Sequence, residues 1–167
     1  IFKEMTNFSD KDRNEMRDRE FVNRFCAFYL LGEENYPGDN QMDKFLADSL
    51  KQMNKMPASE LTDLANRFQT SMKNNQLVFG KHAFRKHSKD TNRQNPLNVA
   101  IFDVFSVYLA RYSEPEAKEK SSQINQVFKR LMADDDFYKA ISGGTAAKRS
   151  IVNKFNAAKK AFEEMVK

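Results

Sequence analysis

The chain has 167 residues, of which 40% are hydrophobic and 31% are charged, and its net charge is +5. This balance is typical of a folded domain with a substantial core and excludes a largely disordered chain. No apolar run reaches about 18 residues, which excludes a membrane-spanning helix, and the single cysteine, Cys26, excludes an internal disulfide. We therefore expect a cytoplasmic domain without contact to the membrane.

Residues 1–14 show no sustained periodicity, so we expect them to be a frayed remnant of a missing upstream region. The first residue is Ile, and no signal-peptide pattern follows it. We interpret the chain as a fragment of a longer protein, with a single helical domain over residues 15–167.

Helical periodicity and turn residues divide the rest of the chain into about seven predicted helices. The first is apolar on nearly all sides between Phe21 and Leu31, which is typical of a buried helix. The third begins at Pro57 or Ser59, and its Asn and Gln residues are expected on a solvated side. The predicted helices cover residues 15–31, 41–55, 57 or 59 to 79, 96–112, 113–133, 135–141 and 145–167.

The helix over residues 96–112 is the most apolar of the set. Asn95 is predicted to be its N-cap, with Pro96 at the first helical position. Apolar residues cover most of its sides, so it needs partners on several faces. We expect an all-α fold, an orthogonal or irregular bundle of about six or seven helices, with the helices over 15–31 and 96–112 at its centre.

Two further helix starts carry capping signals. Ser113 and Glu116 have the spacing of a capping box. After the pair Gly143 and Gly144, Thr145 is predicted to cap the last helix.

Arg24 and Asp103 are each the only charged residue within an apolar helical stretch. A buried charge needs a partner, because leaving one uncompensated costs about 3–5 kcal/mol. We expect the two helices to pack together and the two side chains to share a buried ion pair or polar network. The expected role is architectural.

The sequence contains no catalytic or metal-binding constellation. His82 and His87 are the only histidines, and Cys26 lies in an apolar stretch, where a thiol usually acts as a small hydrophobic residue. We expect no enzymatic activity, no cofactor and no metal site in this chain.

The excess positive charge lies in two segments. Residues 79–95 hold five basic residues and one acidic residue, and residues 145–167 hold six and two. Such clusters are compatible with nucleic-acid binding or with a solvated basic face. The candidate nucleic-acid-binding residues are Lys81, Arg85, Lys86, Lys89, Arg93, Lys148, Arg149 and Lys154.

Within the first basic segment, Phe84 leaves two arrangements open. It could stack on a nucleic-acid base, or it could pack beneath the loop and leave its basic neighbours in solvent. In the second segment, residues 142–149 offer backbone N–H groups near Thr145 for an anion, although a C-cap followed by an N-cap explains the same residues.

Several blocks occur in an order that resembles a known family. They read MRDREFVNRFCAFYLLGEENYPG, MDKFLADSLKQMN, FGKHAFRK, NVAIFDVFSVYLA and FYKAISGGT, followed by a basic helix. Over residues 13–166 the chain resembles the C-terminal helical part of a large bacterial family of ParB/sulfiredoxin-like domains of unknown function. This family includes the GmrS half of GmrSD-type modification-dependent restriction systems.

The resemblance implies a role in DNA restriction or phage defence. In that family a ParB-like N-terminal domain carries a nucleotide-binding and hydrolysing motif, and some members add a histidine-dependent nuclease domain. Neither motif matches any position of this chain. The resemblance therefore implies a non-catalytic helical module that supports a missing ParB-like domain and contacts DNA.

An alternative is a purely structural or protein–protein interaction domain with a solvated basic face. Apolar surface once covered by the missing N-terminal domain would then be exposed, and the chain would self-associate through it.

Overall fold

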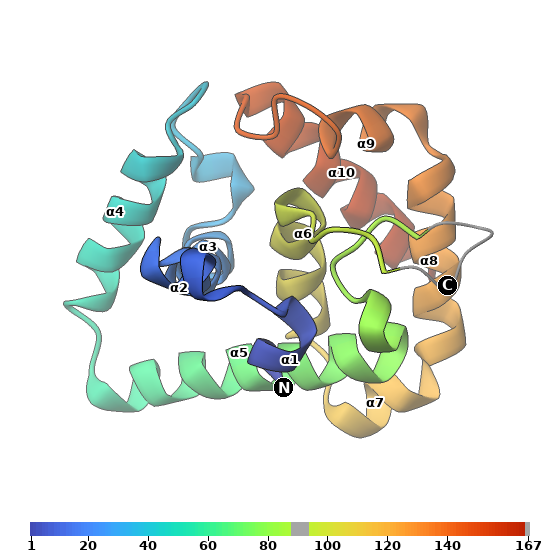
Figure 1. Ribbon diagram of the computed structural model, residues 1–167, viewed down its shortest axis with the longest axis horizontal. Helices are drawn as coiled ribbons and strands as arrows, with labels where there is room; N and C mark the ends of the chain where they lie inside the picture. Colours follow the sequence, from blue (N-terminus) through green and yellow to red (C-terminus); the bar gives the residue numbers. More distant parts are fainter. Residues whose placement is uncertain (88–93, 166–167) are drawn as a thin grey trace.

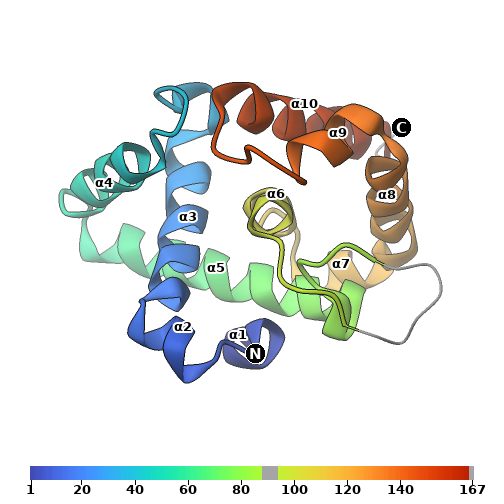
Figure 2. The ribbon, with the colours of Figure 1, turned by 45° about the horizontal axis from the view of Figure 1, so that its top comes forward.

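The computed structural model describes residues 1–87 and 94–165. At its centre lies helix α6 (Val99–Leu109), in which every residue from Ala100 to Leu109 is buried. Helices α3 (Arg17–Leu31), α5 (Ala58–Phe79) and α10 (Lys148–Met165) pack against it, so that α6 is enclosed on several sides (Figures 1 and 2). A helix that is apolar all around requires this arrangement.

The described residues contain ten α-helices and no strand, which confirms the all-α class. Three more helices are present than the expected seven, because residues 1–14 form two and the stretch expected as one helix over 113–133 forms two. Besides α3, α5, α6 and α10, the helices are α1 (Phe2–Thr6), α2 (Asp10–Asn14), α4 (Met42–Met53), α7 (Glu114–Glu119), α8 (Ser121–Ala133) and α9 (Asp135–Ala140), with short 3-10 helices η1 (Glu33–Asn35) and η2 (Gly80–His82).

The expectation of a frayed segment over residues 1–14 is wrong. A capping box starts α2, because the Asp12 N–H donates to the Ser9 hydroxyl and the Ser9 N–H donates to the Asp12 carboxylate. Met5 and Phe8 are buried, and the Phe8 ring meets the Phe21 ring edge-on with 5.2 Å between centroids. Local capping and two apolar anchors therefore hold this segment against the core.

Helix α6 begins three residues later than expected. Its N-cap is Asn98, whose side-chain oxygen accepts the Ile101 N–H at 3.0 Å. The preceding chain stays extended because Leu97 pairs with Arg85 in an isolated antiparallel bridge. Asn95 instead donates its side-chain amide to the Lys86 carbonyl. The tertiary pairing thus overrides the local capping signal at Asn95.

The capping box expected at Ser113 is present. The Ser113 N–H donates to Glu116 at 2.7 Å, and the Glu116 N–H donates to the Ser113 hydroxyl. The helix that it starts ends after two turns, since Lys120 leaves helical geometry with φ −89° and ψ 6°. Helix α8 then runs in a new direction (Figure 1).

Helix α5 places polar side chains against α6 instead of only in solvent. Ser71 donates to the carbonyl of Ser106 at 2.6 Å, and Asn74 donates to the carbonyl of Leu109 at 2.8 Å. Asn75 reaches the carbonyl of residue 105 at 3.2 Å. These bonds satisfy carbonyl groups towards the end of α6 that would otherwise be buried without a partner. The expectation that all Asn residues of this helix face solvent is therefore wrong.

Phenylalanine rings make up much of the core. The Phe102 ring is fully buried and lies 4.7 Å from the Phe21 centroid and 4.8 Å from the Phe84 centroid. Phe2 closes the same cluster at 6.5 Å. The core thus joins α1, α3, α6 and the segment after η2. None of the described helices combines the length and apolar content that crossing a lipid bilayer requires.

Replacing Phe102 with Ala should lower the free energy of unfolding by about 3–5 kcal/mol, because it removes a ring from a fully packed site. Urea denaturation followed by circular dichroism measures the change. Tyr138→Ala is the matched control, since Tyr138 is 45% exposed and its loss should cost about 0.5 kcal/mol or less. Equal losses in the two variants would contradict the central position of Phe102.

Candidate functional site

The predicted nucleic-acid-binding residues do not form one surface. Arg85 is 3% exposed and Lys154 is fully buried, so their assignment to a DNA-binding surface is wrong. Phe84 packs into the core, as in the second of the two arrangements left open for that ring, but Arg85 is buried beside it and does not lie in solvent as that arrangement expected. Lys154 is drawn inward by the carboxylate of Asp103. Lys89 and Arg93 lie outside the described residues.

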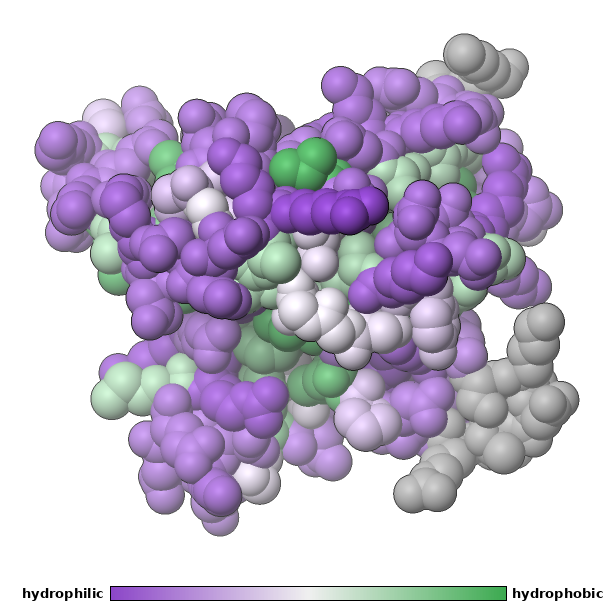
Figure 3. Space-filling model, turned by 90° about the horizontal axis from the view of Figure 1, so that it is seen from above, coloured by the Kyte–Doolittle hydropathy of each residue, from purple (hydrophilic) through white to green (hydrophobic). Residues whose placement is uncertain are grey.

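The remaining described candidates lie in two segments that touch at one point, between Lys86 and Ser142. Lys81, Lys148 and Arg149 are exposed, and Lys86 is half-buried. The Lys86 ammonium donates to the Ser142 hydroxyl at 2.6 Å and lies 4.2 Å from the centroid of the Tyr138 ring. The first basic segment therefore contacts the start of the 142–149 loop. The face of the molecule seen from above is mostly hydrophilic, with apolar residues exposed near its middle (Figure 3).

The predicted anion site at Thr145 is arranged differently from the expectation. Helix α10 begins at Lys148, so Thr145 is not its N-cap. The Lys148 N–H donates to the Asp39 carboxylate at 2.7 Å, and the Tyr36 hydroxyl donates to the Ala146 carbonyl at 2.7 Å. A carboxylate of the chain itself thus occupies the helix start, where its charge is favourable.

The expected contact between Arg24 and Asp103 is present and includes a third member. Arg24 donates to both carboxylate oxygens of Asp103, at 2.8 and 2.7 Å. The Lys154 ammonium donates to the same carboxylate at 2.6 Å. All three side chains are at least nine-tenths buried. This Arg24–Asp103–Lys154 triad links α3, α6 and α10.

The charges of the triad are strongly coupled. Burial alone would raise the pKa of the Asp103 carboxyl, but the charges and hydrogen bonds of Arg24 and Lys154 outweigh it and hold this pKa below its ordinary value of 3.8. The carboxylate is therefore ionised at neutral pH. The triad joins three helices in the core, and at its edge Arg24 also lies 3.5 Å from the carboxylate of the partly exposed Glu20.

A signal for Lys154 was present in the sequence. It lies three residues after Ile151 and four before Ala158, both of which belong to the inward stripe of α10. A lysine in such a stripe predicts a buried partner, in the same way that the isolated Arg24 did. The basic character of the surrounding helix masked this signal.

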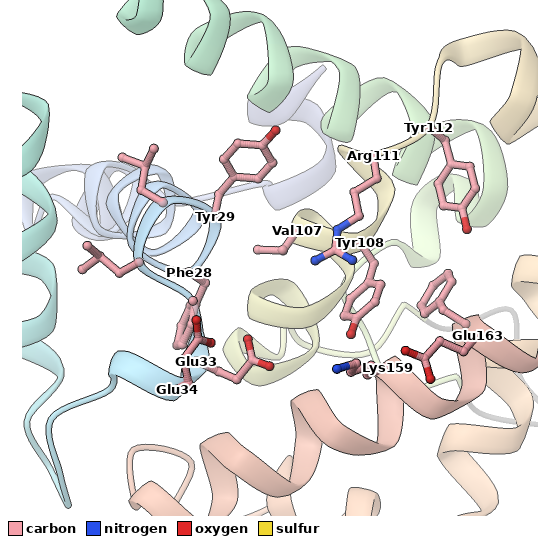
Figure 4. A pocket seen from close by; sticks show the side chains of 14 residues that line it. Phe28, Tyr29, Glu33, Glu34, Val107, Tyr108, Arg111, Tyr112, Lys159 and Glu163 are labelled. Atoms are coloured by element: carbon pink, nitrogen blue, oxygen red, sulfur yellow. The ribbon is translucent and has the colours of Figure 1, made fainter.

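A groove of about 660 Å³ opens between the end of α3, the end of α6 and α10 (Figure 4). Gly32, with a φ of 76°, ends α3 and turns the chain so that η1 brings Glu33 and Glu34 to the groove. The end of α6 supplies Tyr108 and Arg111. Helix α10 contributes Lys159, Phe162 and Glu163, and the remaining lining side chains include Tyr29, Val107 and Tyr112.

The arrangement of aromatic and charged groups in the groove is specific. The Tyr108 ring stacks on Phe162 with 4.6 Å between centroids, and the Arg111 guanidinium lies 4.6 Å from the centroid of Tyr108. In the described part of the chain, the hydroxyls of Tyr29, Tyr108 and Tyr112 form no hydrogen bond to another residue. Burial raises the pKa of Tyr108 to about 12, so its hydroxyl remains a donor at neutral pH.

The groove therefore offers donors without partners beside apolar walls. The Arg111 guanidinium forms no ion pair within the described residues, and it is held in place by its stacking on Tyr108. Glu33 and Glu34 lie across the groove from it (Figure 4). Convergent polar groups in an apolar depression are typical of a binding site.

A second, apolar groove of about 410 Å³ lies between α3 and α4. Val22, Cys26, Leu50 and Met53 line it, and Leu50 is 46% exposed. The other exposed large hydrophobic side chains are spread along the chain, with Leu61 and Leu77 sixteen residues apart on α5, and single exposed residues of this kind are ordinary for a protein surface. Self-association through apolar surface remains a prediction.

The histidine and cysteine side chains of the described residues pack against their neighbours. No three His, Cys, Asp or Glu side chains among them lie close enough to hold a metal ion. The ring centroids of His82 and His87 are 5.5 Å apart, and His87 packs on Phe128. Burial raises the pKa of the Cys26 thiol to about 11, so the nucleophilic thiolate is scarce at neutral pH.

Comparison with protein-family models, with curated proteins and with solved structures finds no match to the chain.

Replacing Asp103 with Asn should lower the free energy of unfolding by about 3–5 kcal/mol, because Lys154 loses its counter-charge and Arg24 keeps only the partly exposed Glu20. Lys154→Met should cost less than about 1 kcal/mol, since Arg24 still neutralises Asp103 and Met fills a similar volume. Urea denaturation at pH 7 measures both changes. A larger loss in Lys154→Met than in Asp103→Asn would contradict the central place of the carboxylate.

The pH dependence is an independent check on the same pair of proteins. The folded-state pKa of Asp103 lies below its unfolded value of 3.8, so its contribution is complete above that value and declines as the pH falls through the folded-state pKa. The difference between the unaltered protein and Asp103→Asn should therefore shrink in acid.

Proposed function

We propose that the chain is a non-catalytic helical binding module whose groove between α3, α6 and α10 receives a segment of another polypeptide. The observation that carries this proposal is the Arg111 guanidinium, which is held over the Tyr108 ring while forming no ion pair within the described residues. An arginine stacked in this way is oriented for a carboxylate before any partner arrives, which reduces the entropic cost of binding.

The composition of the groove favours a polypeptide ligand. Tyr and Arg are the residue types most enriched at protein–protein interfaces, where they supply large contact areas and hydrogen bonds together. Three tyrosines and Arg111 line this groove. Val107 and Phe162 add an apolar wall. A groove with these features suits an extended or helical segment that buries one apolar side chain.

The charges of the groove suggest the sequence character of the segment. Arg111 and Lys159 would meet an acidic side chain, and Glu33 and Glu34 would meet a basic one. The segment that fits best carries an acidic and a basic residue on either side of an apolar anchor.

The resemblance to GmrS-like proteins suggests where this segment would come from. In such a protein the helical module accompanies a ParB-like domain, so a segment of that domain or of a second subunit is the proposed partner. The role of the groove would then be to hold the ParB-like domain, and the associated proposal is a part in DNA restriction or phage defence.

Peptides selected from a displayed random library on the unaltered protein should contain an acidic residue near an apolar one. Arg111→Ala should weaken the selected peptide by about 30-fold, as expected for an interface hot spot of about 2 kcal/mol. Isothermal titration calorimetry measures the affinities. Arg130→Ala is the matched control, because Arg130 is 57% exposed on α8 and does not line the groove.

Unchanged affinity in Arg111→Ala would contradict the groove as the binding site. Equal weakening in Arg130→Ala would show that general surface charge, and not the stacked Arg111, controls binding.

DNA contact is a second candidate function. The contact between Lys86 and Ser142 favours it, because this contact brings the basic segment at Lys81 towards the loop that precedes Lys148 and Arg149. Exposed lysine and arginine side chains on such a surface would contact phosphate groups without reading the base sequence. In this proposal Arg85 and Lys154 take no part.

Duplex DNA should bind in low salt and lose affinity steeply as salt rises, because phosphate contacts release counterions. The double change Lys148→Glu and Arg149→Glu should reduce binding at least about tenfold in fluorescence anisotropy. Lys118→Glu is the control, since Lys118 is exposed on α7. Absence of binding at low salt would remove DNA contact as a function of this chain.

A further inference from the structure

A third pocket lies away from the groove, where the N-terminal segment meets the parts of the chain that precede and follow residues 88–93. It has a volume of about 360 Å³. The chain from Thr6 to Arg17 forms one wall, and Arg85 and residues 94–97 form the other. Helix α1 packs against η2, which brings these two parts of the chain together (Figure 2).

Arg85 is a buried cation that has no counter-charge among residues 1–87 and 94–165. Its side chain is 3% exposed, and it forms no ion pair with the described residues. One guanidinium nitrogen, Nη1, donates to the carbonyls of Ala83 at 2.9 Å and Lys81 at 3.3 Å. The Nε–H is buried and has no acceptor in the described part of the chain. Burial of an unneutralised charge is unfavourable, so an anion bound beside the Arg85 guanidinium would stabilise this arrangement.

Arg24, which is buried to a similar extent, has the carboxylate partner that Arg85 lacks among the described residues. Arg24 is 4% exposed, a burial similar to that of Arg85, and both oxygens of the Asp103 carboxylate face it at 2.8 and 2.7 Å. The described part of the chain therefore supplies a bidentate carboxylate to Arg24 and only carbonyl oxygens to Arg85. A bidentate oxyanion is the natural complement of an arginine side chain.

The backbone holds Arg85 at the pocket despite a strained neighbour. Phe84 has a φ of 60°, a left-handed conformation that is unfavourable for a large side chain. The Phe84 carbonyl accepts the Asn98 N–H at 2.9 Å, and Arg85 pairs with Leu97 in an antiparallel bridge. These contacts fix Arg85 beside the pocket. Strain of this kind is concentrated at functional positions.

The rest of the pocket suits one anionic group. Arg17 is 48% exposed and donates to Asp12 at 2.8 Å, which leaves other guanidinium N–H groups for a ligand. Asp12 is already neutralised by Arg17 and hydrogen-bonded by Ser9. The three charged side chains that line the pocket therefore sum to one positive charge. Gln94 and Asn95 also line the pocket, and their amide N–H groups donate to the carbonyls of Lys81 and Lys86.

We propose that this pocket binds the phosphate or carboxylate group of a small ligand, with Arg85 as the buried anchor and Arg17 at the rim. The pocket takes the oxyanion and a small attached group, and it is separate from the groove proposed to hold a polypeptide. The ligand supplies the counter-charge that the described residues do not.

Thermal unfolding of the complete chain at constant ionic strength tests the proposal. Inorganic phosphate, methyl phosphate and acetate are titrated separately against chloride, so that a phosphate site and a carboxylate site are distinguished. The midpoint temperature should rise with at least one of them. Arg85→Met should need at least about tenfold more of the anion for the same rise, because the anchor of the site is lost.

The same variant tests the missing counter-charge in the absence of anion. Arg85→Met should be at least as stable as the unaltered protein in chloride alone, since it removes an unneutralised buried charge. Arg17→Met, whose side chain is at the rim, should fold and weaken anion binding several-fold. Arg13→Met is the matched control, because Arg13 belongs to the same segment but does not line the pocket.

No rise with any of the three anions would overturn the proposal. An equal rise in Arg85→Met and in the unaltered protein would also overturn it. If Arg85→Met does not fold, Arg17→Met decides: an unchanged response in that variant counts against the site.

Discussion

The Asp103 carboxylate joins the three helices that give this protein its shape. One oxygen faces Arg24 of α3, and the other is shared by Arg24 and Lys154 of α10. Burial would favour the neutral acid, but two cations in direct contact keep it charged. Replacement of an apolar contact by such a triad brings little net stability. The triad instead specifies geometry, because its hydrogen bonds form only when α3, α6 and α10 are placed with Arg24, Asp103 and Lys154 in contact.

The groove is a consequence of that placement. Helix α6 is buried from Ala100 to Leu109, and at its end Tyr108 and, in the turn that follows the helix, Arg111 line the groove together with the turn after α3. Helix α10, fixed to α6 by Lys154, supplies Phe162 as the floor on which Tyr108 stacks. The side chains that line the groove come from segments far apart in sequence. A rigid core therefore presents a preorganised set of donors at its edge.

The buried cations of the chain fall into two kinds. Arg24 and Lys154 share a carboxylate that belongs to the core, whereas Arg85 has only carbonyl oxygens within the described residues. The first kind fastens helices together. Arg85, the second kind, follows the strained backbone of Phe84. In the proposed site a bound anion neutralises it. Burial and pairing therefore have to be considered together before a basic residue is assigned to a surface.

The sequence by itself determined the all-α class, the central place of the helix over residues 96–112, and the Arg24–Asp103 pair, because apolar periodicity and isolated charges are local signals. It did not determine the cap at Asn98, the third member Lys154, or the buried state of Arg85. Each of these depends on a partner distant in sequence: Leu97 pairs with Arg85, and Lys154 reaches Asp103. The groove could not be predicted from the sequence either. Glu33, Tyr108 and Phe162 come together only when α3, α6 and α10 have packed. Only the tertiary structure decided these points, because charge and exposure depend on neighbours that the linear order of residues does not reveal.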